Sequence, residues 1–64
     1  MTRKDYVAIA AMIHRLGTEA TNHAEIATLE KVAKGLVPVF KADNRNFSAD
    51  RFLAACGIEG REGY

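Results

Sequence analysis

In the first part of the chain, apolar residues recur every three or four positions, which places their side chains on one face of a helix. Thr2 stands where an N-cap belongs and Asp5 follows three residues later, so the two approximate a capping box. Gly17 is well placed to end the helix in the left-handed conformation. The pattern predicts a helix from about Arg3 to Leu16. Its apolar face comprises Tyr6, Ile9, Ala10, Ile13 and Leu16.

A second helix is predicted to begin near His23, after the polar connector "GTEATN" at residues 17–22. Asn22, followed three positions later by Glu25, repeats the N-cap pattern. Apolar residues then recur at helical spacing, so this helix also has one apolar face. That face comprises Ile26, Leu29, Ala33, Leu36, Val37 and Phe40.

Two residues oppose a straight second helix. Gly35 costs about 1 kcal/mol relative to alanine in a helix interior, and Pro38 removes one hydrogen bond and crowds the carbonyl of Lys34. Because the apolar spacing continues past Pro38, we predict a kinked helix that ends near Ala42. A break at Leu36 to Pro38 is the alternative, and the sequence does not decide between the two.

The stretch "NFSADRFLAACGI" at residues 46–58 predicts a short third helix with a defined start. Ser48 is a good N-cap, and Asp50 lies in the first turn, where the helix dipole favours an anion. Phe47 and Phe52 occupy the two positions of a hydrophobic staple. These features predict that the helix begins directly after Ser48.

The same stretch also contains a signal for the end of the helix. Gly57 can take the left-handed position after the helix, which makes Leu53 and Ile58 the apolar pair of a Schellman ending. The tail "EGREGY" at residues 59–64 is polar and rich in glycine, and we expect it to be flexible. Since no alternating strand pattern is present, the predicted fold is all-α. It is a single three-helix domain over residues 1–58, with two longer antiparallel helices and a short third one.

The charge balance excludes some partners. Nine Lys and Arg residues stand against eight Asp and Glu residues, which gives a formal net charge of +1. Such a balance provides no overall field to attract nucleic acid or a membrane surface. His14 and Arg15 interrupt the first apolar run, so it fits neither a signal peptide nor a membrane span. We therefore expect a cytoplasmic protein with no membrane partner.

The residues that could carry chemistry have simpler interpretations. The single cysteine, Cys56, lies near the end of the third predicted helix, where the helix dipole opposes a thiolate. We interpret it as a small buried side chain. His14 and His23 lack the close spacing of zinc ligands, and Glu25 and Glu30 point to different sides of their helix. We expect no enzymatic activity, no metal site and no cofactor.

Nucleic-acid binding is an alternative function. Residues 31–51 have a local excess of positive charge, but the connector before the third helix is longer than the turn of a helix-turn-helix. Arg51 is the only strong base-reading donor of the third helix. A nucleic-acid-binding regulator would use Lys31, Lys34, Lys41, Arg45 and Arg51.

Protein association has more support. A domain of about 60 residues buries only about 60% of the surface that its unfolded chain exposes, so a lone monomer gains little stability. Both long helices have apolar residues outside their main stripe, which are either additional core or an exposed interface. We favour the interface and expect a homo-oligomer, in the first instance a dimer through the two long helices. The additional apolar residues are Val7, Ala8, Ala11, Met12, Val32 and Val39.

Both ends of the chain resemble a family of small, uncharacterised proteins of bacteriophages and prophages. The resemblance rests on the opening "MTRKDYVAIA" and the closing "FKADNRNFSADRFLAACGI", which are joined by a middle that varies freely. It covers about half of the chain. Family members often read Asn-Pro-Arg-Phe where this sequence has Asn44, Arg45, Asn46 and Phe47, so the rigidity of that proline is missing here.

The family offers no activity to transfer, but it implies a setting. Short phage proteins without an enzyme motif often bind and inhibit or redirect a host protein, including components of antiphage defence. We therefore expect a host-protein partner in the bacterial cytoplasm. A third hypothesis, below nucleic-acid binding, is sequestration of a small anionic ligand at helix N-termini or a subunit interface. The candidate interaction residues are Arg3, Lys4, Val7, Ala11, Met12, Val32 and Val39.

Overall fold

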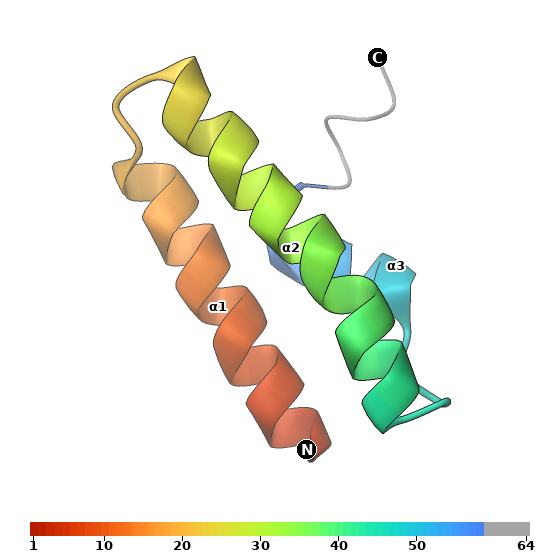
Figure 1. Ribbon diagram of the computed structural model, residues 1–64. Helices are drawn as coiled ribbons and strands as arrows, with labels where there is room; N and C mark the ends of the chain where they lie inside the picture. Colours follow the sequence, from red (N-terminus) through yellow and green to blue (C-terminus); the bar gives the residue numbers. More distant parts are fainter. Residues whose placement is uncertain (59–64) are drawn as a thin grey trace.

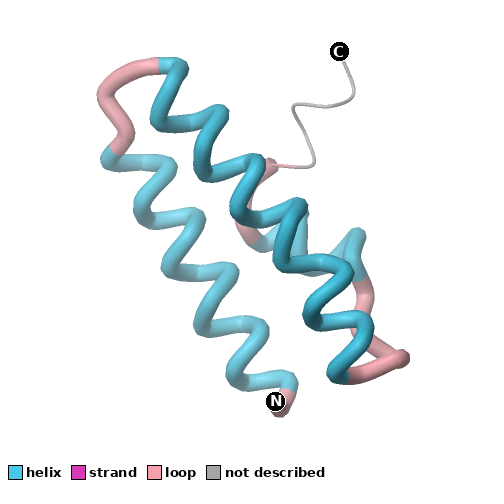
Figure 2. Tube along the Cα trace, viewed as in Figure 1, coloured by secondary structure: helices cyan, strands magenta, loops and turns pink. Residues whose placement is uncertain are grey.

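The computed structural model describes residues 1–58, and within them the chain forms three helices and no strand. They are α1 (Arg3–Glu19), α2 (His23–Asp43) and α3 (Ala49–Ala55). Figure 1 shows α1 and α2 lying side by side and antiparallel, with α3 packed behind one half of the pair. Short loops join the helices (Figure 2). The predicted all-α, three-helix fold is confirmed, whereas the predicted flexible tail lies outside the described residues.

Helix α1 starts as predicted but ends later. The backbone N–H of Thr2 donates to Asp5 Oδ2 at 2.9 Å, which secures the first turn. Gly17 does not adopt a positive φ, so the predicted left-handed ending after Leu16 is wrong. The helix continues to Glu19 and ends where Ala20 turns to an extended conformation. Asn22, two residues later, is also extended and caps the next helix.

Helix α2 is continuous through Gly35 and Pro38, so the alternative of a break is wrong. Its N-cap is confirmed, because Asn22 Oδ1 accepts the N–H of Glu25 at 3.0 Å. Pro38 is exposed, and Phe40 two residues later is only 3% exposed. Continuing the helix past Pro38 brings the Phe40 ring into the core, and this burial offsets the cost of the proline.

Helix α3 has the predicted signals at both ends. At its start, Ser48 Oγ accepts the N–H of Arg51 at 3.3 Å. At its end, Gly57 has a φ of 81°, and the N–H of Ile58 donates to the carbonyl of Leu53 at 3.1 Å. This bond, together with the Gly57 N–H to the carbonyl of Ala54 at 3.0 Å, makes a Schellman ending. The prediction for this helix is confirmed.

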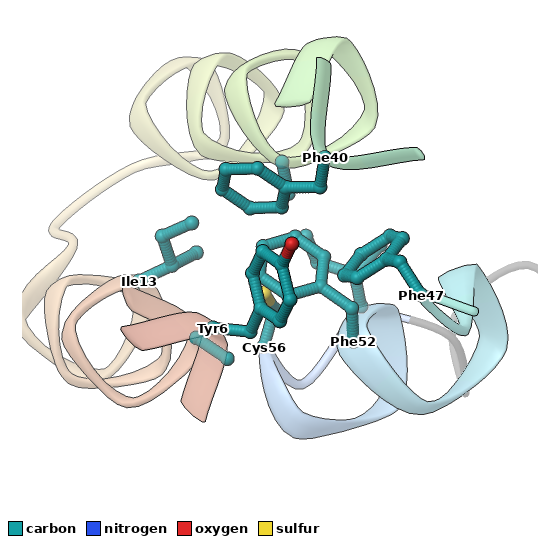
Figure 3. Packing of buried hydrophobic residues seen from close by; sticks show 9 residues of the cluster. Tyr6, Ile13, Phe40, Phe47, Phe52 and Cys56 are labelled. Carbon is teal, nitrogen blue, oxygen red and sulfur yellow. The ribbon is translucent and has the colours of Figure 1, made fainter. Parts of the chain in front are cut away.

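The core gathers at one end of the bundle. Four aromatic rings, from Tyr6, Phe40, Phe47 and Phe52, pack with centroids 4.9 to 5.5 Å apart (Figure 3). Such separations are favourable for tilted and edge-to-face ring pairs. The staple between Phe47 and Phe52 is therefore present. The buried residues are Tyr6, Ala10, Ile13, Ala33, Phe40, Phe47, Phe52, Cys56 and Ile58.

None of residues 14–32 is buried. We call this part of the α1–α2 pair the hairpin end, and the remainder of the described chain the packed end. Leu16, which was expected in the core, lies in the hairpin end and is 38% exposed. Figure 1 shows the reason, since α3 lies against the other half of the pair and does not cover this level.

Candidate binding surfaces

Large apolar side chains remain at the surface of both long helices. Their exposed fractions range from 38% for Leu16 to 59% for Val39. The additional apolar residues of α1 and α2 thus do not extend the core. The large exposed side chains of the two helices are Val7, Met12, Leu16, Val32 and Val39.

In α2, two valines point away from α3. Lys41, the residue after buried Phe40, donates from Nζ to the carbonyl of Phe47 at 3.0 Å and so lies on the α3 side. Val39, the residue before Phe40, therefore lies on the opposite side of the helix, since neighbouring residues are about 100° apart. Val32 precedes Val39 by two helical turns and shares its stripe.

The same logic orients Met12 in α1. His14, the residue after buried Ile13, lies on the α3 side, because its Cδ2 is 2.7 Å from where a Cβ on Gly57 would be. Met12, the residue before Ile13, therefore points away from α3, and Leu16 follows one turn later. We call the surface formed by Met12, Leu16, Val32 and Val39 the open face.

A second surface is concave. A groove of about 340 Å³ lies between α1 and α3, and we call it the α1–α3 groove. Its apolar floor consists of Tyr6, Val7, Ala10, Phe47, Phe52 and Ala55. Its polar residues are Arg3, Asn44, Asn46, Ser48 and Arg51.

The structure divides the seven predicted interaction residues between these surfaces. Arg3 and Val7 line the α1–α3 groove. Met12, Val32 and Val39 belong to the open face. The remaining two, Lys4 and Ala11, are exposed on α1 outside both surfaces. Sequence periodicity found the apolar members but could not show that they face different directions.

The predicted nucleic-acid residues are also dispersed. Arg51 is the only one of the five that lines the groove, which Arg3 also lines. Lys41 is held by the Phe47 carbonyl, and Arg45 lies exposed in the turn after α2. Lys31 and Lys34 lie on α2, which contributes no residue to the groove. Sequence reasoning placed Arg51 in a basic patch and missed that it lines the same groove as Arg3, because this placement depends on how α3 crosses α1.

A polar cluster joins α1 to the end of α2. The Tyr6 hydroxyl and the Met1 ammonium group both donate to Asp43 Oδ2, each at 2.9 Å. The Met1 ammonium, followed by the Tyr6 hydroxyl, lowers the pKa of Asp43. Burial, and then the bond to Asp43, raises the pKa of Tyr6. The phenol thus stays protonated and acts as a hydrogen-bond donor that fixes the position of Tyr6 below the groove.

Cys56 is buried and free, as predicted. Burial raises the pKa of its thiol, so the thiol form persists near neutral pH. Within residues 1–58, no three His, Cys, Asp or Glu side chains gather where they could hold a metal ion. In the same part of the chain, no helix is both long and apolar enough to cross a membrane.

Comparison with known proteins does not identify the chain. No model of a protein family matches it. Neither a curated protein nor a solved structure matches it.

Proposed function

We propose that this protein acts without catalysis, by binding another protein, and that it does so as a dimer formed through the open face. One observation carries the proposal: Met12, Leu16, Val32 and Val39 are exposed on the same side of the α1–α2 pair. Clustered apolar side chains on a small protein are typical of association surfaces. The alternative to burying them in a partner is to leave them in water.

A second copy of the chain is the first partner for this face. The core of one copy is confined to the packed end, and none of residues 14–32 is buried. Two α1–α2 pairs that meet through their open faces would form a four-helix arrangement around a two-fold axis. Such a dimer would bury apolar surface that a single chain leaves exposed, and so offset the limited burial of a small domain.

The target of the dimer is proposed to be a host protein in the bacterial cytoplasm. This step follows from the phage setting that the sequence resemblance implies, and components of antiphage defence are included among the targets. In this proposal the α1–α3 groove, which lies away from the open face, stays accessible in the dimer.

The dimer is tested by its mass in solution. Size-exclusion chromatography with light scattering is expected to give twice the mass of the chain. Val32→Asp places a carboxylate on the open face and should give a monomer with the same helical circular dichroism. Ala27→Asp is the matched control, because it adds the same charge to the same helix about 140° away from Val32, at an exposed position. A monomeric wild-type protein, or monomers from both variants, would contradict the dimer.

The binding of a target is tested by capture from bacterial lysate. A tagged variant with Arg3→Glu, Lys4→Glu and Met12→Asp changes both surfaces and should lose any protein that the wild type retains specifically. Tagged Ala27→Asp should retain it. If the triple variant captures the same protein equally well, these residues do not contact the target.

A further inference from the structure

The α1–α3 groove combines an apolar floor with two arginines. Arg3 comes from the first turn of α1, and Arg51 comes from α3. Within residues 1–58, neither guanidinium group has a hydrogen-bond or ion-pair partner. No acidic residue of this range lines the groove. The two positive charges are therefore not neutralised at the groove, and they stand next to apolar surface.

The shape of the floor leaves room for a side chain. Ala55 from α3 is exposed and contributes only a methyl group, Val7 from α1 is 58% exposed, and Ala10 lies beneath them at 1% exposed. The aromatic residues beneath are fixed, because Tyr6 is bonded to Asp43 and the rings of Phe47 and Phe52 pack at 5.5 Å. A rigid, concave, apolar floor is suited to an anchor side chain, since little order has to be gained on binding.

We infer that the α1–α3 groove binds a segment of a partner protein in which a large apolar side chain stands next to a carboxylate. The apolar side chain lies on the floor between the exposed side chains of Val7 and Ala55. The carboxylate, from an aspartate or glutamate of the partner, meets the guanidinium groups of Arg3 and Arg51. Arginine forms paired, charge-assisted hydrogen bonds with a carboxylate, which gives both orientation and selectivity.

Two observations favour a protein segment over other ligands. Sites for small molecules place a few polar groups deep inside the pocket, but among the described residues no polar or charged side chain is buried. Nucleic-acid bases need exposed aromatic faces for stacking, but Tyr6, Phe47 and Phe52 are at most 8% exposed. The polar residues of the groove are instead suited to the backbone of a bound segment, as with Ser48 and Asn46.

This inference rests on the proposed function only in that the chain acts by binding a protein. It concerns a surface on the opposite side of α1 from the open face, so each can fail alone. A groove that binds acidic segments in a monomeric protein would contradict the dimer and leave the groove intact. A dimer whose groove binds no acidic segment would contradict this inference and leave the proposed dimer intact.

The experiment is an NMR titration of the full ¹⁵N-labelled chain with two synthetic peptides. The first is the N-acetylated and C-amidated pentapeptide Gly-Asp-Phe-Asp-Gly, and the second is Gly-Asn-Phe-Asn-Gly with the same ends. The acidic peptide, at up to about 5 mM, should shift the amide signals of residues 44–48, Arg51 and Ala55. The amide analogue has the same size and anchor but no charge, and should bind at least tenfold more weakly.

Variants locate the binding. Arg51→Gln and Arg3→Gln should each weaken the acidic peptide about tenfold, which corresponds to one charge-assisted contact. The matched control is Arg45→Gln, which removes the same charge from an exposed position outside the groove and should change affinity less than twofold. Ala55→Leu fills the floor and should weaken both peptides. Its own spectrum shows whether it stays folded, and the arginine variants leave the core untouched.

Three results would overturn the inference. The first is the absence of shifts at the groove amides with the acidic peptide. The second is a failure of charge selectivity, seen either as equal binding of the two peptides or as an equal loss of affinity in Arg45→Gln and Arg51→Gln. Either outcome would mean that the charges of the groove do not select the ligand. The third is a hexathymidylate that shifts the same amides at lower concentration than the acidic peptide, which would assign the groove to nucleic acid.

Discussion

The packed end and the hairpin end are built from the same two long helices, yet only the packed end has a core. At the packed end, α3 covers the α1–α2 pair, and each of the nine buried residues within residues 1–58 lies there. At the hairpin end, Leu16 is exposed, and Ile26 and Leu29 are only partly buried. Two helices packed side by side cannot enclose a side chain on all sides, whereas a third helix laid across them can.

The hairpin end depends instead on local bonds. Asn22 and Glu25 cap the start of α2, and Thr18 Oγ1 donates to the Arg15 carbonyl at 2.7 Å near the end of α1. An N-cap such as Asn22 contributes about 0.5 to 2 kcal/mol, which is less than the ~3 to 5 kcal/mol lost when a buried phenylalanine is removed. A helix-forming sequence therefore maintains the hairpin end, while tertiary packing stabilises the packed end.

The largest expected loss of stability comes from removing an aromatic side chain from the core of the packed end. Phe52→Ala should destabilise the protein by about 3 to 5 kcal/mol, because it leaves a cavity among the aromatic rings. That loss is comparable with the whole free energy of unfolding of a domain of this size, about 3 to 10 kcal/mol. The measurement is chemical denaturation followed by circular dichroism at 222 nm.

Leu29→Ala is the matched change at the hairpin end. It removes a large side chain that is only partly buried and replaces it with the best helix former, so the cost should be about 1 kcal/mol or less. Equal losses in Phe52→Ala and Leu29→Ala would show that the two ends unfold with the same energetics and would remove the contrast.

Replacing a glycine by alanine should change the stability in opposite directions at the two ends. Gly57 at the packed end has a φ of 81°, and an added Cβ would lie 2.7 Å from His14 Cδ2. Gly57→Ala should therefore cost about 1 to 2 kcal/mol. Gly17 at the hairpin end is helical, and an added Cβ meets nothing within 4 Å. Gly17→Ala should stabilise by about 0.5 to 1 kcal/mol. Thermal unfolding of both variants decides the matter, and a stabilising Gly57→Ala is the result that would refute it.

The smallest effect is the dependence on alkaline pH, and it arises at the packed end. Burial raises the pKa of Cys56 above its ordinary value of 9.0 and the pKa of Tyr6 above 10.0. Each group thus binds its proton more tightly when folded, so its contribution is present below the unfolded pKa and is lost as the pH rises through the folded pKa. The melting temperature should fall above about pH 9, and less steeply in Tyr6→Phe. Parallel pH profiles of the two proteins would argue against a role for Tyr6.

Local sequence signals predicted the helices well. The three helices begin as predicted after Thr2, Asn22 and Ser48, and α3 ends at Gly57 as predicted. These predictions are correct because each capping signal involves only residues that are close together in the sequence. The prediction that α1 ends at Gly17 is wrong because it also relied on local sequence alone. A glycine near the end of an apolar stripe can end a helix or continue it, and here α1 continues through Gly17 to Glu19.

The surfaces could be predicted only in part. Periodicity separated Val32 and Val39 from the main stripe of α2, and both are exposed. The presence of Arg3 and Arg51 in the lining of one groove could not be predicted, because no local rule gives the direction in which α3 crosses α1. The exposure of Leu16 has a similar cause, since it depends on how far α3 reaches.

The hairpin end gives the molecule room to change over evolutionary time. Because residues 14–32 contain no buried side chain, we expect substitutions beyond His14, which lies against Gly57, to leave the aromatic cluster in place. Insertion of about two helical turns in each long helix would move the connecting loop outward and leave the packed end in register. Within residues 1–58, residues 1–10 and 40–58 contain every buried residue except Ile13 and Ala33. The α1–α2 pair can thus change in length and sequence at the hairpin end while the packed end keeps its structure.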